Sequence, residues 1–283
     1  MKVPDIFLEA ETVLRMADPV DKANASIALY RLWLSLPETV QEQSLVQPSV
    51  SVVQVIDAPG RPERPALVEA HQLPRRGLGS VAGRVALVHS LAHIEFNAIN
   101  LALDAVYRFR EMPSAYVTDW LRVASDEGEH FLLLHHRLST LDSHYGALSA
   151  HDGLWDMARR TDHDVLVRMA LVPRILEARG LDVAPPMIAK LQHLKDEATA
   201  DILQRIYTDE ITHVEVGNRW FRFVCEQQGL DGTDVFRDLL RGENSAYLRS
   251  PYNREARLQA GFNEQELALI REMELEYQAA RQA

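Results

Sequence analysis

The chain has 283 residues and is 47% hydrophobic, which is enough apolar content for a sizeable core. Its 41 acidic and 30 basic residues give a net charge of -11, which argues against broad electrostatic binding to nucleic acid or an anionic membrane, although a local basic patch would still permit it. The one cysteine, Cys225, excludes an internal disulfide framework and a cysteine-rich metal site. The amino terminus has no apolar signal core and no window approaches a membrane span, so we expect a cytoplasmic protein.

The first 46 residues predict a helical pair that packs on the main body. Apolar residues recur at helical spacing over residues 5–16 and 21–36. Residues 47–79 contain too many prolines and glycines for a helix or a central strand. We therefore predict an extended, Pro- and Arg-rich segment there, in which residues 51–56 could form a short strand.

The first core helix is predicted from Ser80 to Phe109, and it carries Glu95 on its apolar face. The positions that share the stripe of Glu95 at a 3.6-residue period are apolar. Burying an unpaired carboxylate is costly. Glu95 must therefore be protonated, paired with a cation or bound to a metal.

A second helix is predicted from Tyr116 to Leu141. It places Glu127 and His130 on one face, because residues three apart in a helix point in the same direction. Such a pair can chelate a metal. Gly128 between them costs about 1 kcal/mol relative to alanine in a helix interior, which indicates either a close backbone approach or a small pocket beside the metals.

A third helix is predicted over residues 153–179 and is ended by Gly180. It carries Glu177 in its last turns. Pro173 lies four residues earlier and should kink the helix, so the helical period alone does not place Glu177.

The fourth helix is predicted over residues 186–228, with a break near residues 195–196. It carries Glu210 and His213, a second Glu-x-x-His pair. Beyond it, residues 231–283 predict a C-terminal helical extension. That extension has a short helix near residues 235–240 and an amphipathic one from about residue 264, where Asn263 and Glu266 fit a capping box.

The strongest signal is a motif that occurs twice, as Asp126-Glu127-Gly128-Glu129-His130 and as Asp209-Glu210-Ile211-Thr212-His213. From the first copy to the second, both motif ligands move by 83 positions, and the lone glutamates Glu95 and Glu177 are 82 positions apart. A single Glu-x-x-His is weak evidence, but this doubled set is the pattern of two-metal carboxylate proteins built on a four-helix bundle. The candidate metal ligands are Glu95, Glu127, His130, Glu177, Glu210 and His213.

This pattern predicts an all-α fold with a four-helix bundle over residues 80–230. Two pseudo-repeated helical hairpins would form the bundle. The helical pair of residues 1–46, the extended segment 47–79 and the C-terminal extension 231–283 would be added to it.

Four glutamates and two histidines supply four negative charges and mostly hard oxygen donors. Two divalent ions neutralise this set, and the mixed oxygen and imidazole ligands suit iron, manganese or a mixed pair better than a thiolate-seeking metal. Zinc also accepts these donors. By analogy with other such sites, open coordination positions would take O2 as a co-substrate.

The aspartates that precede the motif glutamates, Asp126 and Asp209, extend the resemblance. This Asp-Glu-x-x-His form is similar to that of di-iron monooxygenases and ribonucleotide reductase small subunits, in which the aspartate supports a ligand histidine on the opposite helix. The resemblance implies that Asp126 supports His213 and that Asp209 supports His130. The arginine that often precedes the histidine in those proteins is absent from both motifs, so the supporting network must differ.

Two aromatic residues near the motifs could have a catalytic role. Tyr207 lies one turn before Glu210, and Trp120 lies two turns before Glu127. Either could be redox-active or line a pocket, but aromatic residues at core positions more often serve packing. Among the other histidines, His89 and His93 are the hardest to dismiss, because they lie close to Glu95 on its helix.

Five runs resemble the uncharacterised ferritin-like family known as domain of unknown function 455. They are Leu73 to Ser80, His89 to Glu95, Ala150 to Trp155, Val172 to Asp182 and Gly217 to Phe221. The match covers most of residues 20–240. It implies a ferritin-like bundle and supports the six ligands, but that family has no established reaction. A more distant similarity to the ferritin-like tRNA hydroxylase implies oxygen-dependent hydroxylation without identifying a substrate.

Three functions remain as hypotheses. The first is a two-metal oxidoreductase that activates O2 to oxidise or hydroxylate an unknown small molecule, in a small pocket beside Glu95, Gly128 and Gly217, with electrons from an external donor. The second is an iron-binding protein with ferroxidase activity, although the long additions at both ends argue against a storage cage. The third is a non-catalytic helical scaffold, but buried ion pairs contribute little stability and two symmetric copies would be hard to explain. A homodimer is left open.

Overall fold

The computed structural model describes residues 4–46, 52–74 and 76–281, and within them every regular element is a helix. The predicted all-α class is therefore confirmed. The only β feature in these residues is an isolated bridge between Leu67 and Ala150. The suggested strand at residues 51–56 is absent from 52–56, and Ser51 lies outside the described residues. The chain divides into two compact units, residues 1–159 and 160–283.

The helices of the first unit are α1 (Ile6–Leu14), α2 (Pro19–Ser35), α3 (Glu38–Val46), the 3-10 turn η1 (Ala70–Gln72), α4 (Val81–Arg108), α5 (Ser114–Thr140) and α6 (Gly153–Arg160), whose last residue already belongs to the second unit. The predicted N-terminal pair is thus followed by a third helix. Pro37 ends α2 as expected, but its carbonyl also accepts hydrogen bonds from the amides of Val40 and Gln41. Proline is well tolerated at the start of a helix, so Pro37 both follows the end of α2 and precedes the first residue of α3.

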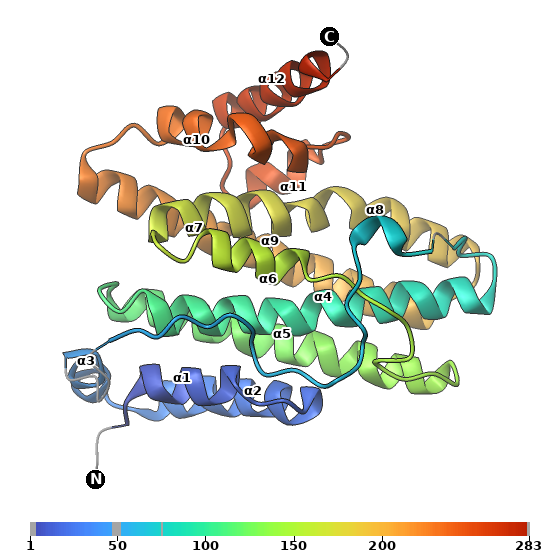
Figure 1. Cartoon of the computed structure of the whole chain (residues 1–283), viewed down its shortest axis with the longest axis horizontal. Coiled ribbons are helices and arrows are strands. Elements are labelled where there is room, and N and C mark those ends of the chain that lie inside the picture. The colour runs from blue at the N-terminus through green and yellow to red at the C-terminus, as the bar shows by residue number, and fades with distance from the viewer. Residues whose placement is uncertain (1–3, 47–51, 75, 282–283) are drawn as a thin grey trace. The chain divides into compact units, whose positions relative to one another are not determined.

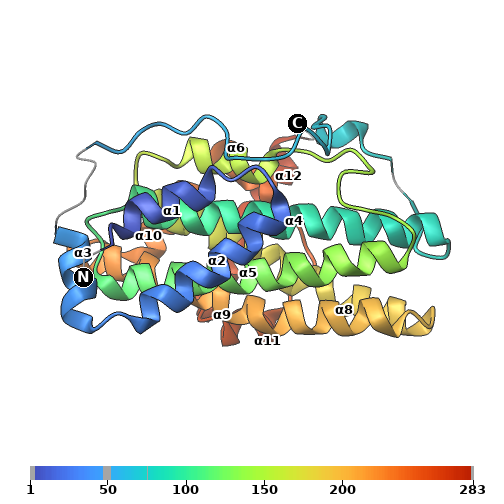
Figure 2. The same cartoon turned by 90° about the horizontal axis from the view of Figure 1, so that it is seen from below.

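Four helices of this unit run side by side. α4 and α5 form an antiparallel hairpin, α2 packs along α5, and α1 packs along α4 (Figures 1 and 2). Ser80 caps α4, since its hydroxyl accepts a hydrogen bond from the amide of Gly83 at 3.1 Å. The predicted bounds of both hairpin helices are correct to within two residues.

A buried lysine joins the N-terminal helices to the hairpin. Lys22 of α2 is fully buried. Its ammonium group donates to Asn100 Oδ1 at 2.5 Å, to the Gly60 carbonyl at 2.6 Å and to the Leu14 carbonyl at 2.9 Å. Three donors meet three acceptors, so α1, α2, α4 and the segment around Gly60 are held at one point.

The second unit contains α7 (Val165–Leu171), the π-helical turn η2 (Val172–Glu177), α8 (Ala178–His193), α9 (Glu197–Gln228), α10 (Gly232–Leu240), the 3-10 turn η3 (Gly242–Tyr247), α11 (Arg254–Gln259) and α12 (Glu264–Ala280). α8 and α9 form a hairpin whose connection lies at residues 194–196 (Figures 1 and 2), where the break in the fourth helix was expected. The predicted capping box of Asn263 and Glu266 begins α12.

The predicted boundary between the third and fourth helices is wrong. Gly180 does not end a helix, and Pro185 and Pro186 do not begin one, because all three lie inside α8. Pro185 has no amide to give to the carbonyl of Leu181, but Asn253 supplies a side-chain N–H to that oxygen at 3.1 Å. A donor from a distant segment therefore replaces one helical hydrogen bond, which periodicity and local propensity cannot anticipate.

A buried arginine ties the C-terminal extension to α8. Arg257 of α11 donates from Nε to Asp182 Oδ1 at 2.9 Å and from Nη2 to Asp182 Oδ2 at 2.7 Å, and the pair is almost completely buried. The guanidinium group also lies over the rings of Tyr252 and Phe262. This two-pronged contact fixes the orientation of α11 on the helix.

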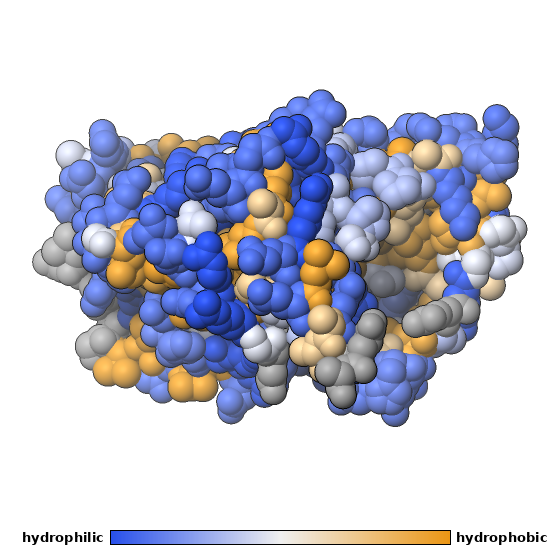
Figure 3. Space-filling view, turned by 90° about the horizontal axis from the view of Figure 1, so that it is seen from above, coloured by the Kyte–Doolittle hydropathy of each residue, from blue (hydrophilic) through white to orange (hydrophobic). Residues whose placement is uncertain are grey.

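Hydrophilic side chains dominate the face shown in Figure 3, and apolar side chains appear there only in small separate groups. Among the described residues, no helix is both long enough and apolar enough to span a membrane.

Candidate metal centre

The first unit brings three of the predicted ligands together. Glu95 of α4 and Glu127 and His130 of α5 each offer a ligand atom, and these atoms lie within 4.8 Å of one another. His130 Nδ1 is 3.3 Å from Glu127 Oε2 and 3.5 Å from Glu95 Oε2. All three residues are at most 3% exposed. The inward direction of Glu95, predicted from its apolar stripe, is confirmed.

Two carboxyl groups in one buried place repel each other when both are ionised. Burial raises the pKa of Glu95 well above its usual range, and the neighbouring Glu127 raises it further, while His130 opposes the shift. Without a cation, the pair must therefore retain a proton. A divalent ion would remove that requirement, so the donor set and its surroundings fit a metal.

Gly128 allows α2 to approach α5 closely. A Cβ atom at this position would lie 2.8 Å from the backbone oxygen of Ala23 on α2. Of the two explanations that the sequence left open for Gly128, a close backbone approach is the one that the structure contains. The glycine inside the first motif is thus explained by packing on the N-terminal helices.

The second motif lies on α9, in the second unit. Glu210 is 8% and His213 1% exposed, and His213 Nδ1 is 3.6 Å from Glu210 Oε1. The Glu-x-x-His spacing therefore brings carboxylate and imidazole together in both units, as helix geometry predicts.

Glu177 occupies a different backbone from Glu95. It is the last residue of η2, and its side chain is half-buried. Pro173 lacks the amide that a regular α-helix would use, and the chain widens there into a π-helical turn, an irregularity that occurs often at functional sites. A Cβ atom at Gly217 on α9 would lie 2.3 Å from the ring of Pro173. The glycine therefore makes room for the proline that shapes this turn.

Arg174, the third residue of η2, contacts α12 and two aromatic rings. It is completely buried, pairs with Glu266 of α12, and lies over the rings of Phe221 and Phe236 at 4.1 and 3.9 Å. The cost of burying this cation is offset by its carboxylate partner and by the aromatic faces. The C-terminal extension thus helps to fix the backbone that carries Glu177.

Both motif aspartates contact an arginine one turn earlier. Asp126 Oδ2 is 3.6 Å from Arg122 Nε, and Asp209 Oδ2 is 3.6 Å from Arg205 Nε. The two arginines are also 83 positions apart, so the repeat extends to Arg-x-x-x-Asp-Glu-x-x-His. The motif predicted from the sequence did not include these arginines, although each lies four residues before its aspartate. The proposed support of each histidine by the aspartate of the other motif stays a prediction.

The two aromatic candidates differ in their surroundings. Trp120 is 1% exposed and packs against Tyr116, with ring centres 6.2 Å apart. Tyr207 is half-buried, and its hydroxyl accepts a hydrogen bond from Asn253 Nδ2 at 3.2 Å. Tyr207 thus joins the network that holds α11, and a redox role for either residue stays a prediction.

His89 and His93 anchor the loop that follows α5. His89 Nε2 accepts a hydrogen bond from the amide of Gly146 at 2.9 Å. His93 Nδ1 is 2.8 Å from Tyr145 Oη, and its Nε2 is 3.1 Å from the carbonyl of His151. These contacts give both histidines a structural role close to Glu95.

The chain is similar to known proteins over most of its length. A family described as "Protein of unknown function (DUF455)" matches residues 15–268. The chain belongs to this family. An uncharacterized protein of Haemophilus influenzae (strain ATCC 51907 / DSM 11121 / KW20 / Rd) is 39% identical over 279 residues, which cover 96% of each chain. No solved structure matches. The family assignment confirms the resemblance found in the sequence, and it leaves the reaction open.

Proposed function

We propose that this protein is a two-metal carboxylate oxidoreductase that uses O2 to oxidise or hydroxylate a small organic molecule. The observation that carries the proposal is the buried group of Glu95, Glu127 and His130, where two carboxyl groups lie beside an imidazole with no space for bulk water to stabilise their charge. The duplicated motif supports a second set from Glu177, Glu210 and His213. The ferritin-like bundle belongs to this proposal.

In this proposal all six residues hold the same pair of ions, with iron preferred and manganese or a mixed pair as alternatives. The four carboxylates neutralise the charge of two divalent ions. His130 and His213 supply one imidazole each, and the turn held by Arg174 presents Glu177. Bound iron would supply redox chemistry with O2, and an external donor would supply electrons.

Metal content tests the first half of the proposal. Protein purified without added metal or chelator, or reconstituted anaerobically with ferrous iron, should contain about two metal ions per chain. Glu127→Ala and His213→Ala should each lose most of this metal, while circular dichroism shows the same helix content. No metal in the wild-type protein, even after reconstitution, would contradict the proposal and favour a scaffold.

Oxygen consumption tests the second half. Iron-loaded wild-type protein with a chemical reductant should consume O2 faster than the same iron content free in buffer, and the two ligand variants should not. Repeated oxidation of added ferrous iron far beyond two equivalents per chain would instead identify a ferroxidase, with no need for an organic substrate.

A further inference from the structure

We propose that the second unit contains a binding pocket for an aromatic organic anion, a planar ring that bears a phosphate or carboxylate group. The pocket has a volume of about 600 Å³ and is lined by Arg160, Gly242, Ala246, Tyr247, Arg249 and Tyr277. This volume is in the range of small-molecule sites. The proposal does not depend on the metal centre.

The lining carries positive charge in an acidic protein. The sequence contains 41 acidic and 30 basic residues, yet among the side chains that the structure describes the lining has two arginines and no carboxylate. Arg249 is exposed, and none of the described residues forms an ion pair with its guanidinium group. A planar guanidinium group that forms no such ion pair can donate two parallel hydrogen bonds to a phosphate or carboxylate group.

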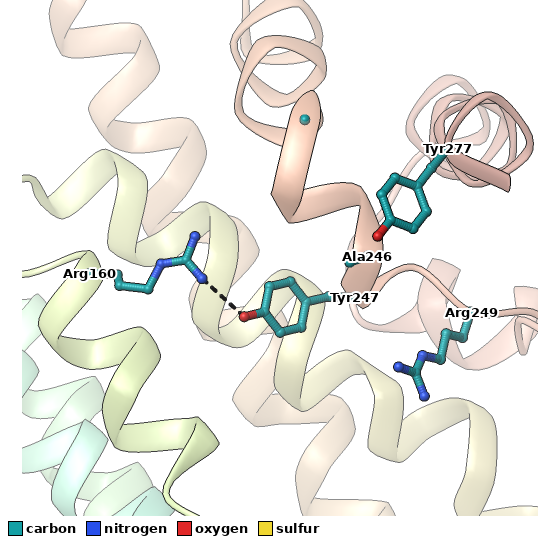
Figure 4. Close-up of a pocket in the computed structure, with 6 residues that line it drawn as sticks. Arg160, Ala246, Tyr247, Arg249 and Tyr277 are labelled. Carbon is teal, nitrogen blue, oxygen red and sulfur yellow. Dashed lines mark hydrogen bonds between the residues drawn. The ribbon is translucent and has the colours of Figure 1, made fainter. Parts of the chain in front are cut away.

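The aromatic part of the ligand is inferred from the tyrosines. Figure 4 shows the rings of Tyr247 and Tyr277 and the two guanidinium groups arranged around the pocket, with Tyr277 contributed by α12 and Tyr247 by η3. Both rings are half-buried, so each keeps surface exposed to a ligand. Tyrosine faces and guanidinium planes both stack on flat rings, which an inorganic anion alone cannot exploit.

Several contacts hold this pocket in shape without a ligand. Arg160 Nη1 donates to Tyr247 Oη at 3.0 Å. Arg179 donates to the carbonyl of Arg249 at 2.6 Å, and the amide of Ser250 donates to Glu274 Oε1 on α12 at 2.8 Å. The backbone of Arg249 is thereby fixed while its side chain remains available. Such preorganisation lowers the entropy lost on binding.

The test is calorimetric titration of the full chain with AMP, which has both a ring and a phosphate. Inorganic phosphate and adenosine serve as the two half-ligands. We expect one AMP per chain and binding at least about tenfold weaker for each half-ligand. A chelator should leave AMP binding unchanged, which separates this pocket from the metal centre. Phosphate that binds as tightly as AMP, or no AMP binding, would overturn the proposal.

Variants locate the site. Arg249→Gln should weaken AMP binding by about tenfold or more, because it removes a charge-assisted contact. Tyr277→Leu should weaken AMP and leave phosphate binding unchanged. Arg237→Gln is the matched control, since Arg237 lies on α10 of the same unit and pairs with Asp234 outside the pocket. Equal AMP affinity in Arg249→Gln and wild type would place the ligand elsewhere.

Discussion

The two hairpins carry the same types of candidate ligand on different backbones. In α4–α5 the lone glutamate, Glu95, belongs to an uninterrupted helix and lies within 3.5 Å of His130. In the second unit Glu177 ends a π-helical turn that Pro173 shapes and Arg174 braces. The candidate ligands therefore repeat between the two hairpins, but the helix geometry of the backbone that carries them does not. In the proposed centre, the second set of ligands would therefore depend more on the residues that hold its backbone.

The N-terminal and C-terminal extensions also differ in the buried polar contact that each makes with its hairpin. Asn100 and Asp182 lie 82 positions apart, five residues after Glu95 and Glu177 respectively. Each is buried and receives a cation from a terminal extension, Lys22 for Asn100 and Arg257 for Asp182. In the first unit the acceptors are neutral, and in the second the partner is a carboxylate.

The largest expected effect is the loss of Arg257. Arg257→Met should lower the free energy of unfolding by about 3 kcal/mol, because the buried carboxylate of Asp182 loses both close contacts with Arg257 and keeps only the longer cation contact, with Arg179 Nη1 at 3.4 Å. Lys22→Met should cost less, about 1–3 kcal/mol, since it leaves neutral oxygens unpaired. Denaturant unfolding of both variants measures the difference. Adding Asp182→Leu to Arg257→Met should recover most of the loss, and failure to recover would mean that Arg257 acts through packing.

A second prediction concerns the motif aspartates. If Asp126 orients a ligand histidine, Asp126→Asn should lower metal affinity by about 10–100-fold, and Asp209→Asn should match it. Arg122→Gln serves as the control, because it removes the partly exposed ion pair but leaves the carboxylate. Competition with a metal-binding dye gives the affinities. Equal affinity in Asp126→Asn and wild type would contradict a role of this aspartate in metal binding.

A third prediction compares Gly128, inside the first motif, with Gly217, one helical turn after the second. Gly217→Ala should destabilise the chain by about 1–3 kcal/mol, since its Cβ atom would lie 2.3 Å from the ring of Pro173. Gly128→Ala should cost less, because the nearest atom, the Ala23 oxygen, is at 2.8 Å. The midpoint temperatures of thermal unfolding measure the difference in stability between the two variants. In a Pro173→Gly background, which removes both ring carbons that the new Cβ atom would meet, Gly217→Ala should cost little stability, whereas additive losses would show that the two positions do not share one contact.

The smallest expected effect is a pH dependence in the first unit. Burial lowers the pKa of His89 to about 4, from 6.5. The unfolded chain then takes up the proton first, so this contribution to stability is complete above pH 6.5 and is lost as the pH falls toward 4. Urea unfolding between pH 7.5 and 4.5 should show a shallower loss for His89→Gln than for wild type. The exposed His136→Gln should behave like wild type, and an unchanged slope in His89→Gln would assign the loss to other groups.

Much of this molecule can be predicted from its sequence, because its signals are local. Helical period gave the bounds of α4 and α5 and the inward direction of Glu95, and the spacing of three gave both Glu-x-x-His contacts. One error arose where a distant residue replaces a local hydrogen bond, as Asn253 does for Pro185. Another is the break at residues 161–164, which divides the predicted third helix between α6 and α7. The positions of Arg174 and Arg257 also depend on tertiary partners, which no local pattern reveals.

X-ray absorption at the iron edge of the reconstituted protein tests most directly whether the two motifs serve one centre. The proposal predicts iron in oxygen and nitrogen coordination, with a second iron scattering from roughly 3.5–4 Å. It also predicts that His130→Ala and His213→Ala each remove that iron-iron signal. Isolated iron with no iron neighbour, or a signal that survives the loss of either histidine, would contradict a shared two-metal centre.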